Sequence, residues 1–314
     1  MNESPIVDWA TLTDLPKEGT VCWTSRSLVA FVSARLPFEV VASIETPRSG
    51  LARLVVVGGG SLIDRAKVWR RELSPDTWMV VVPSLWGSGA ENSPIAVLNE
   101  GDVKVIKMGP DFLPDARAYS RELTELIPPE AALWGAGDAW SHALEGFLSP
   151  LSNDALREEM ASFIRDVLLP LEPGTGDFAW FEASAKACSL QSRSGVGLIH
   201  AIAHQIEPTL KRDAKESVGH ARLCSTLLLP VFDYNRSRGS KVDDLFRKHG
   251  IPLGDCRAML RRFFDEADYR RWMPTIESSW SLILRQPLAR INCALVRADS
   301  LDFFRTFLPE EGET

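Results

Sequence analysis

The sequence predicts an α/β half followed by an all-helical half, and three observations support this prediction. Two apolar stretches that read as buried strands, residues 54–57 and 78–83, are each followed directly by a turn rich in glycine and serine. The first of these turns leads into a helical pattern over residues 62–71. After the proline-rich residues 126–130 the strand signal fades, and segments such as residues 154–169 repeat apolar side chains at helical spacing. We therefore expect the domain boundary near residue 130.

Weaker signals complete the expected elements. Residues 19–24 and 38–43 read as strands on either side of a short helix at 27–36, and residues 95–98 and 103–108 read as a hairpin. Helices are expected in the second half at residues 131–148, 153–169, 177–194, 197–207, 219–229, 241–248, 256–267, 275–285 and 300–308. His249 is expected at a helix C-terminus, where a cationic side chain complements the helix dipole.

The composition is that of an ordinary globular protein and excludes some classes of function. The 314 residues suffice for about two domains, and 45% hydrophobic with 25% charged residues is a common balance. The formal net charge of −7 argues against a nucleic-acid partner. The sequence has no run of about 18 apolar residues that would predict a membrane helix, and residues 1–17 lack the apolar core of a signal peptide. The five cysteines form no C-x-x-C pair, so we expect reduced thiols and a cytoplasmic location.

The first glycine-rich turn, Gly58-Gly59-Gly60-Ser61, is suited to binding a phosphate. It joins a buried strand to a helix, so the N–H groups at the helix N-terminus are available to an anion. A plain strand-to-helix turn would use the same glycines, and this alternative stays open. A second Gly/Ser-rich turn covers residues 84–91 and follows the next buried strand. In a doubly wound sheet such turns gather at the carboxyl ends of the strands, where cofactors bind.

The histidines carry the chemical signal of the second half. The chain has five histidines, at positions 142, 200, 204, 220 and 249. Asp138 and His142 are four residues apart, as are His200 and His204, so each pair lies on one face of its expected helix. Together with His220 they predict a site for a divalent metal such as iron or zinc. The spacing does not say which histidines bind the metal and which one works beside it.

These motifs resemble, in the same order, those of the iron-containing (group III) alcohol dehydrogenases of the dehydroquinate synthase-like superfamily. Residues 58–67 are similar to the family's G-G-G-S-x-x-D-x-A-K, and residues 84–91 to its T-T-x-G-T-G-S-E. Residues 137–145 resemble G-M-D-A-L-x-H-A-x-E. Residues 199–204 resemble the H-x-x-x-H segment, and residues 219–231 the helix that begins at a histidine and ends in L-L-P-x-V. The resemblance covers most of the chain, from about residue 19 onward.

The resemblance implies a fold and a set of site residues. The implied fold is a Rossmann-like nicotinamide-binding domain in residues 1–130, a helical domain in residues 131–314 and an active site in the cleft between them. The implied metal ligands, for Fe²⁺ with Zn²⁺ as the alternative, are Asp138, His142, His200 and His220, and His204 is the implied proton relay. The implied cofactor contacts are Ser25, Gly59, Gly60, Ser61, Asp64, Ser84, Leu85, Ser88 and Lys104.

The chain departs from the family pattern in several places. The connection at residues 44–52 is short, which removes cover from the cofactor. Leu85 replaces a threonine of the second turn, and His220 stands between Gly219 and Ala221 where the family has proline and glycine. A charged insert at residues 211–216 is expected as an exposed loop. After the first strand, Arg26 stands where an acidic residue would favour NAD, so the chain leans towards NADPH.

The sequence therefore predicts a metal-dependent oxidoreductase that transfers hydride between NAD(P)H and a small aldehyde or primary alcohol, in the reductive direction. A second hypothesis is a dehydroquinate synthase-like cyclase, a lyase, although the D-x-x-x-H spacing of Asp138 and His142 argues against it. A third is a non-catalytic member with a degenerate cofactor domain. The expected partner is a small-molecule substrate, with no nucleic acid and no membrane, and a homodimer is the family's common assembly.

Overall fold

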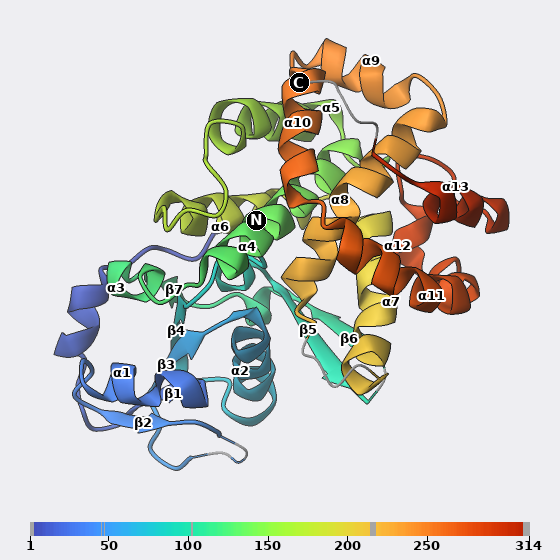
Figure 1. Ribbon diagram of the computed structural model, residues 1–314. Coiled ribbons are helices and arrows are strands. Elements are labelled where there is room, and N and C mark those ends of the chain that lie inside the picture. Colours follow the sequence, from blue (N-terminus) through green and yellow to red (C-terminus); the bar gives the residue numbers. More distant parts are fainter. Residues whose placement is uncertain (1–2, 45, 47, 102, 214–217, 310–314) are drawn as a thin grey trace. The chain divides into compact units, whose positions relative to one another are not determined.

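The computed structural model describes residues 3–309 except 45, 47, 102 and 214–217 (Figure 1). The chain divides into two compact units. The first consists of Met1–Leu98, Val105–Pro128 and Gly176–Ser189, and the second of Asn99–Lys104, Pro129–Thr175 and Leu190–Thr314. None of the described helices is long and apolar enough to cross a membrane.

A five-stranded parallel sheet forms the centre of the first unit. Its strands lie in the order β2 (Glu39–Val41), β1 (Thr20–Thr24), β3 (Arg53–Gly58), β4 (Trp78–Pro83) and β7 (Ala116–Arg117) (Figure 1). The neighbouring strands pair in parallel, with Val56 opposite Val81 in the two central strands. The predicted strands in the first half are therefore present, and β7 is an edge strand that the sequence pattern did not reveal.

The central strands are apolar along their whole length because both faces of the sheet are covered. Val55 and Val80 belong to a core cluster on one face, which includes Val32 of α1 (Val29–Ser33). Val56 and Val81 belong to the cluster on the other face, which Ile63 of α2 (Gly60–Leu73) completes. Parallel strands covered on both faces show this continuous apolar pattern, because side chains alternate between the faces.

The first unit also contains shorter elements, which are η1 (Trp9–Asp14), η2 (Arg26–Leu28), η3 (Ala90–Asn92), η4 (Pro110–Phe112) and α3 (Arg121–Thr124). The strands β5 (Ile95–Glu100) and β6 (Val103–Met108) form a separate two-stranded sheet, of which residues 99–104 belong to the second unit. The expected helix at residues 27–36 is only η2 and the single turn of α1. Helix α6 (Ala179–Gln191) groups mainly with this unit. Its Ser184 Oγ accepts a hydrogen bond from Gly87 N at 2.7 Å, and Phe181 packs on Trp86 and Tyr119.

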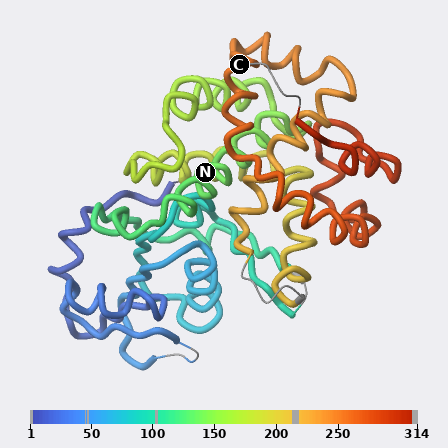
Figure 2. Tube along the Cα trace, in the orientation of Figure 1, coloured from blue at the N-terminus to red at the C-terminus, as the bar shows by residue number. Residues whose placement is uncertain are grey.

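The second unit is helical. Its elements are α4 (Pro129–Leu148), α5 (Asp154–Phe163) with the π-helical turn η5 (Ile164–Leu168), α7 (Leu198–Asp213), α8 (His220–Ser237), α9 (Lys241–Lys248), α10 (Leu253–Phe263), α11 (Glu266–Ile283), α12 (Pro287–Arg290), η6 (Ala298–Ser300) and α13 (Leu301–Thr306). Figure 2 follows the chain through them, from green at α4 to red at α13. Helix α4 packs against both α5 and α8, and α7 packs against α8.

Several predicted helix boundaries are wrong. The helix expected at residues 275–285 is α11, which begins nine residues earlier, and the helix expected at residues 256–267 is α10, which ends four residues earlier. The sequence predicted ends at residues 207 and 229, each just before a proline, but α7 continues through Pro208 and α8 through Pro230. Beyond Pro230 the side chains of Val231, Phe232 and Tyr234 are buried, and their burial outweighs the local cost of a proline in a helix. The expected exposed loop at residues 211–216 is helical and exposed at Lys211 and Arg212, and its residues 214–216 lie outside the described part of the chain.

A buried carboxyl group in the first unit makes stability depend on pH. The side chain of Glu91, in η3, is fully buried, and burial raises its pKa to about 7 against the opposing effects of its own backbone hydrogen bond and of the Arg117 and Lys67 charges. Because this pKa lies above the unfolded value of 4.5, the folded state binds a proton that the unfolded state releases between the two values. The contribution of Glu91 to stability is therefore greatest at low pH and falls as the pH rises through about 7.

Glu91→Gln is expected to remove this dependence. The amide keeps the size of the side chain and needs no ionisation, so the free energy of unfolding above pH 7 should rise by up to about 3 kcal/mol. Urea unfolding of both proteins at several values between about pH 5 and pH 8 measures the effect. The two curves should converge at the acidic end. Parallel curves across the whole range would contradict the assignment of the shift to Glu91.

Candidate functional site

Helix α4 carries the first two predicted metal ligands on a buried face. Its side chains are buried continuously from Gly135 to Leu148, which includes Asp138 and His142. His142 Nε2 lies 3.9 Å from Asp138 Oδ1, as expected for residues one helical turn apart. A carboxylate buried in this way is costly unless cations or hydrogen-bond donors surround it. The side chains that surround the Asp138 carboxylate therefore indicate what it binds.

Three histidines from α7 and α8 meet this pair. The ring centroids of His200 and His142 are 4.6 Å apart, and those of His200 and His220 are 5.4 Å apart. His220 Nε2 also lies 3.9 Å from Asp138 Oδ1. His204 is a neighbour of both, with its ring centroid 5.1 Å from that of His220 and 5.7 Å from that of His200. The structure thus brings together all four predicted ligands and the predicted relay histidine.

A cysteine outside the predicted set of ligands belongs to the same cluster. One donor atom from each of Asp138, His200, His220 and Cys224 lies within 4.8 Å of the other three. Cys224 Sγ is 3.4 Å from His220 Nε2, and its side chain is fully buried. Cys224 follows His220 by four residues on α8, so the same i, i+4 spacing that selected the histidine pairs could have found it.

Glu145 positions His200. Its Oε2 is 2.7 Å from His200 Nδ1, and its Oε1 accepts a hydrogen bond from Ile199 N at 2.6 Å. A carboxylate on Nδ1 fixes the tautomer and leaves Nε2 as the ligand atom. Among the described residues Nε2 has no hydrogen-bond partner, although it is buried. Glu145 is the last residue of the motif at residues 137–145 and had no predicted role. Its position three residues after His142 on one helix is the sequence feature that could have indicated one.

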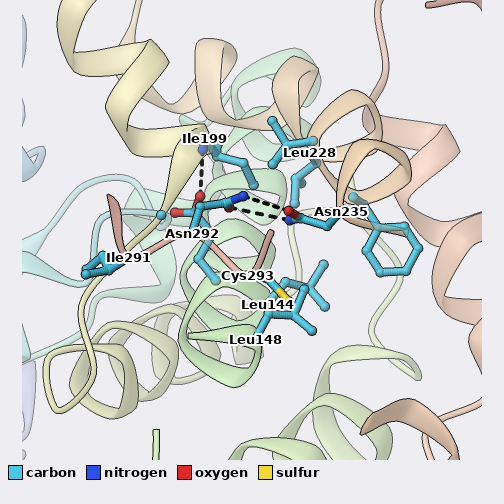
Figure 3. Close-up of a pocket in the computed structure, with 12 residues that line it drawn as sticks. Leu144, Leu148, Ile199, Leu228, Asn235, Ile291, Asn292 and Cys293 are labelled. Atoms are coloured by element: carbon cyan, nitrogen blue, oxygen red, sulfur yellow. Dashed lines mark hydrogen bonds between the residues drawn. The ribbon is translucent and has the colours of Figure 1, made fainter. Parts of the chain in front are cut away.

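A small cavity lies beside Glu145. Leu144, Leu148 and Leu228 form part of its apolar lining, and the side-chain amides of Asn235 and Asn292 close it, with Asn292 Nδ2 donating to Asn235 Oδ1 at 2.7 Å. Figure 3 shows this amide pair and the hydrogen bond at Ile199. The lining holds the Glu145 carboxylate in apolar surroundings, which strengthens its bond to His200.

Glu207 joins the predicted cofactor lysine to the histidine cluster. It lies on α7, three residues after His204, and forms ion pairs with Lys104 of β6 and with Lys211, the latter at 2.5 Å. Glu207 Oε2 is also 3.5 Å from His220 Nδ1. Lys104 belongs to the second unit, and its role as a cofactor contact stays a prediction. Sequence reasoning could not find the pair of Lys104 and Glu207, because the two residues are 103 positions apart in the sequence.

The pKa values of three imidazoles in the cluster, those of His142, His204 and His220, are lowered. Burial, and then the proximity of His200, lowers the pKa of His142 to about 3. Burial and the Lys104 charge lower the pKa of His204 well below its usual value, and the same two causes lower that of His220. Neutral imidazoles and a carboxylate are the donors that divalent transition metals take, so the residues fit such an ion.

The two glycine-rich turns of the first unit lie side by side. Ser84 N donates to Gly58 O at 3.0 Å, and a Cβ added to Gly60 would stand 2.3 Å from Ser88 Oγ. Only glycine fits at position 60 without displacing the second turn. Gly59 is the N-cap of α2, and in the described structure no side chain caps this helix end. The N–H groups of its first turn can therefore receive a phosphate.

The other predicted cofactor residues have varied surroundings. Asp64 is buried and accepts a hydrogen bond from Val97 N at 3.0 Å, so its carboxylate ties α2 to β5. Ser61 is exposed in the first turn of α2, and Leu85 is half-buried in the second glycine-rich turn. Ser25 is half-buried directly after β1, where its hydroxyl bonds to that of Ser27 at 3.1 Å. Their contacts with a cofactor stay predictions.

Comparisons with known proteins agree on one group of enzymes. The chain is 32% identical over 186 residues to the 1-propanol dehydrogenase PduQ of Salmonella typhimurium, covering 52% of this chain and 50% of that protein. It is 26% identical over 190 residues to the maleylacetate reductase of Sphingobium indicum, covering 58% of this chain and 51% of that protein. The chain thus spans about half the length of the curated relatives it matches. None of the protein-family models compared with it matches.

Solved structures match over nearly the whole chain. An iron-containing alcohol dehydrogenase from Corynebacterium glutamicum superposes with a TM-score of 0.75 at 17% identity, covering 96% of this chain and 94% of that one. At this identity the similarity bears on the fold alone. It confirms the predicted fold class, a Rossmann-like α/β part followed by a helical part.

Proposed function

We propose that this chain, which belongs to the iron-containing (group III) alcohol dehydrogenase family, is a metal-dependent oxidoreductase that transfers hydride between NAD(P)H and a small aldehyde. We further propose that residues 1–130 bind the cofactor and residues 131–314 hold the metal. The observation that carries the proposal is the convergence of Asp138 with four neighbouring histidines from three helices. If the cluster had only a structural role, several imidazole nitrogens would be buried without a cation or hydrogen-bond donor to accept their lone pairs, which is costly.

The proposed metal ligands are Asp138, His142, His200 and His220. A divalent ion bound there, Fe²⁺ or Zn²⁺, supplies Lewis-acid polarisation of a carbonyl oxygen. Glu145 orients His200 through Nδ1, so that Nε2 faces the cluster. The burial of Asp138 and His200 keeps bulk water away from these donors, which strengthens every electrostatic interaction among them.

His204 is the proposed proton relay. Its imidazole is neutral, and it lies next to two proposed ligands, so a ring nitrogen can carry a proton to or from the substrate oxygen. The nicotinamide cofactor supplies the hydride. The turns at Gly59, Gly60 and Ser88 present backbone N–H groups and space for its pyrophosphate.

The proposed substrate is a small aldehyde, reduced to its primary alcohol. The relatives are a 1-propanol dehydrogenase and a maleylacetate reductase, which are enzymes for small carbonyl compounds and their alcohols.

The proposed cofactor preference is for NADPH, since Arg26 is exposed shortly after β1 and can meet a 2′-phosphate. Arg26→Ala should then raise the KM for NADPH and leave that for NADH nearly unchanged.

The test combines metal analysis with cofactor oxidation. The purified chain is analysed for bound metal by mass spectrometry, and then NADPH and NADH oxidation are followed with propanal, acetaldehyde and maleylacetate. Activity that is lost with a chelator and restored by Fe²⁺ or Zn²⁺ supports the proposal. A metal-free protein that oxidises neither cofactor with any of these carbonyls would overturn it. Turnover without net consumption of the cofactor would point to cyclase chemistry and overturn it as well.

A further inference from the structure

Cys224 has a position that no role in the proposed reaction accounts for. Its thiol is fully buried on α8, one turn after His220, and faces the donors of α4 and α7. The tight group of donor atoms, all within 4.8 Å of one another, contains Cys224 together with Asp138, His200 and His220. His142 lies beside this group, 3.9 Å from Asp138.

The packing of α8 against α4 places the Cys224 sulfur next to Asp138. Gly137 meets Ser225 so closely that an added Cβ would stand 2.9 Å from Ser225 Cα. The residues next to this contact are Asp138 on α4 and Cys224 on α8. The close approach of the two helices therefore brings the carboxylate and the thiol together, and both of these side chains are buried.

A second observation shows that the cluster is built to hold a cation. His200 Nε2 is buried and, within the described part of the chain, without a hydrogen-bond partner, while Glu145 occupies Nδ1. His200 is also one of the four residues whose donor atoms lie close together. An imidazole oriented from behind by a carboxylate, with its other nitrogen open, is the usual arrangement of a metal-binding histidine.

We propose that Cys224 is itself a metal ligand and takes the fourth ligand position, which the proposed function gave to His142. Its sulfur would bind the ion together with Asp138, His200 and His220, so that this site selects Zn²⁺ over Fe²⁺. The inference rests on the proposed function for the presence of a metal. Two imidazoles, one carboxylate oxygen and one thiolate form a four-donor set of the kind that zinc takes, and a soft sulfur ligand favours zinc over harder ions. On binding, the thiol proton passes to solvent and the sulfur–metal bond replaces the S–H bond.

Cobalt substitution tests the sulfur ligand directly. Co²⁺ bound by a thiolate shows a strong sulfur-to-metal charge-transfer band in the near ultraviolet, whereas nitrogen and oxygen ligands alone give weaker visible bands. The wild-type chain loaded with Co²⁺ is expected to show this band, and Cys224→Ser is expected to lose it while keeping the visible bands. The matched control is Cys256→Ser on α10, a cysteine that is equally buried and absent from the donor group found among the described residues. It should keep the band.

Metal affinity gives a second measurement that does not depend on activity. Competition with a chromophoric chelator should show that Cys224→Ser loses Zn²⁺ affinity about tenfold or more, and loses less affinity for Mn²⁺, which prefers oxygen and nitrogen donors. Cys224→Ala and circular dichroism check that the loss is not one of folding. X-ray absorption of the wild-type zinc protein should give a Zn–S distance of about 2.3 Å.

The outcomes separate this inference from the proposed function. A wild-type chain that binds Co²⁺ and Zn²⁺ without a charge-transfer band or a Zn–S distance would overturn the sulfur ligand and leave the proposed function intact. A chain that binds neither ion would overturn both. A charge-transfer band in a protein that reduces no aldehyde would support the sulfur ligand and overturn the proposed reaction alone.

Discussion

His200→Ala is expected to leave the chain without bound divalent metal and to lower kcat/KM for aldehyde reduction by about a thousandfold. The imidazole contributes the Nε2 donor to the cluster, and its removal also leaves the buried Glu145 carboxylate without its histidine partner. A buried carboxylate that has lost its histidine partner destabilises the folded state, so the melting temperature should fall as well. Metal content by mass spectrometry, steady-state kinetics and thermal unfolding measure the three effects.

His249→Ala is the matched control. His249 directly follows α9, is also buried, and its Nδ1 lies 2.7 Å from a carboxylate oxygen of Glu158. Its Nε2 also has no partner in the described structure, so the two histidines differ mainly in the donors that surround them. Metal content and kcat/KM should therefore stay near the wild-type values in this variant. Equal metal loss in both variants would mean that the cluster does not define the site.

Glu145→Gln provides a graded comparison in the same assays. The amide can still bond to His200 but no longer offers a negative charge to Nδ1, so the ring is held less firmly and is a weaker donor. Metal affinity should fall by about 10- to 100-fold, which is less than for His200→Ala. If Glu145→Gln bound metal as tightly as the wild type, the assignment of a positioning role to Glu145 would be wrong.

The sequence predicted those parts of the fold that local patterns specify. β3 and β4 each contain three consecutive valines, and α9 has the predicted bounds, since charge and apolar spacing agree there. Helix ends near prolines could not be predicted locally. α11 runs through Pro274 from an N-cap at Asp265, whose side chain accepts from Asp268 N, because its apolar side chains are buried. Tertiary burial, which no local pattern contains, decides these cases.

The part of the candidate site that depends on spacing within one helix could be predicted from the sequence. The pairs Asp138 with His142 and His200 with His204 follow from i, i+4 spacing, and their convergence requires only that the helices pack. The partners of these groups come from elsewhere in the chain. Glu145 meets His200 across 55 residues, and Lys104 on β6 meets Glu207 on α7. Such contacts depend on how whole elements pack, so the sequence indicated the ligands but not the groups that orient and neutralise them.

Gly137→Ala is expected to lower the free energy of unfolding and the metal affinity together. The added Cβ would stand 2.4 Å from Ser225 Oγ, 2.6 Å from Ser225 Cβ and 2.9 Å from Ser225 Cα. Because the last of these is a backbone atom, no change of side-chain rotamer relieves the clash, and α4 and α8 must separate. Overpacking of this kind costs about 1–3 kcal/mol, and the better helix propensity of alanine offsets up to about 1 kcal/mol of it. Chemical unfolding and Zn²⁺ competition measure both effects.

The two effects are coupled because the contact adjoins the site. Asp138 follows Gly137 on α4, and Cys224 precedes Ser225 on α8, so separation of the helices draws donors from opposite sides of the cluster apart. Gly137→Ala combined with Ser225→Gly removes two of the three close atoms and should recover part of both losses. Gly254→Ala on the exposed first turn of α10 is the control, since no described atom lies within 4 Å of the added Cβ there. That variant should be as stable as the wild type or slightly more stable, and an equal loss in it would show that glycine replacement itself, not the α4–α8 contact, causes the effect.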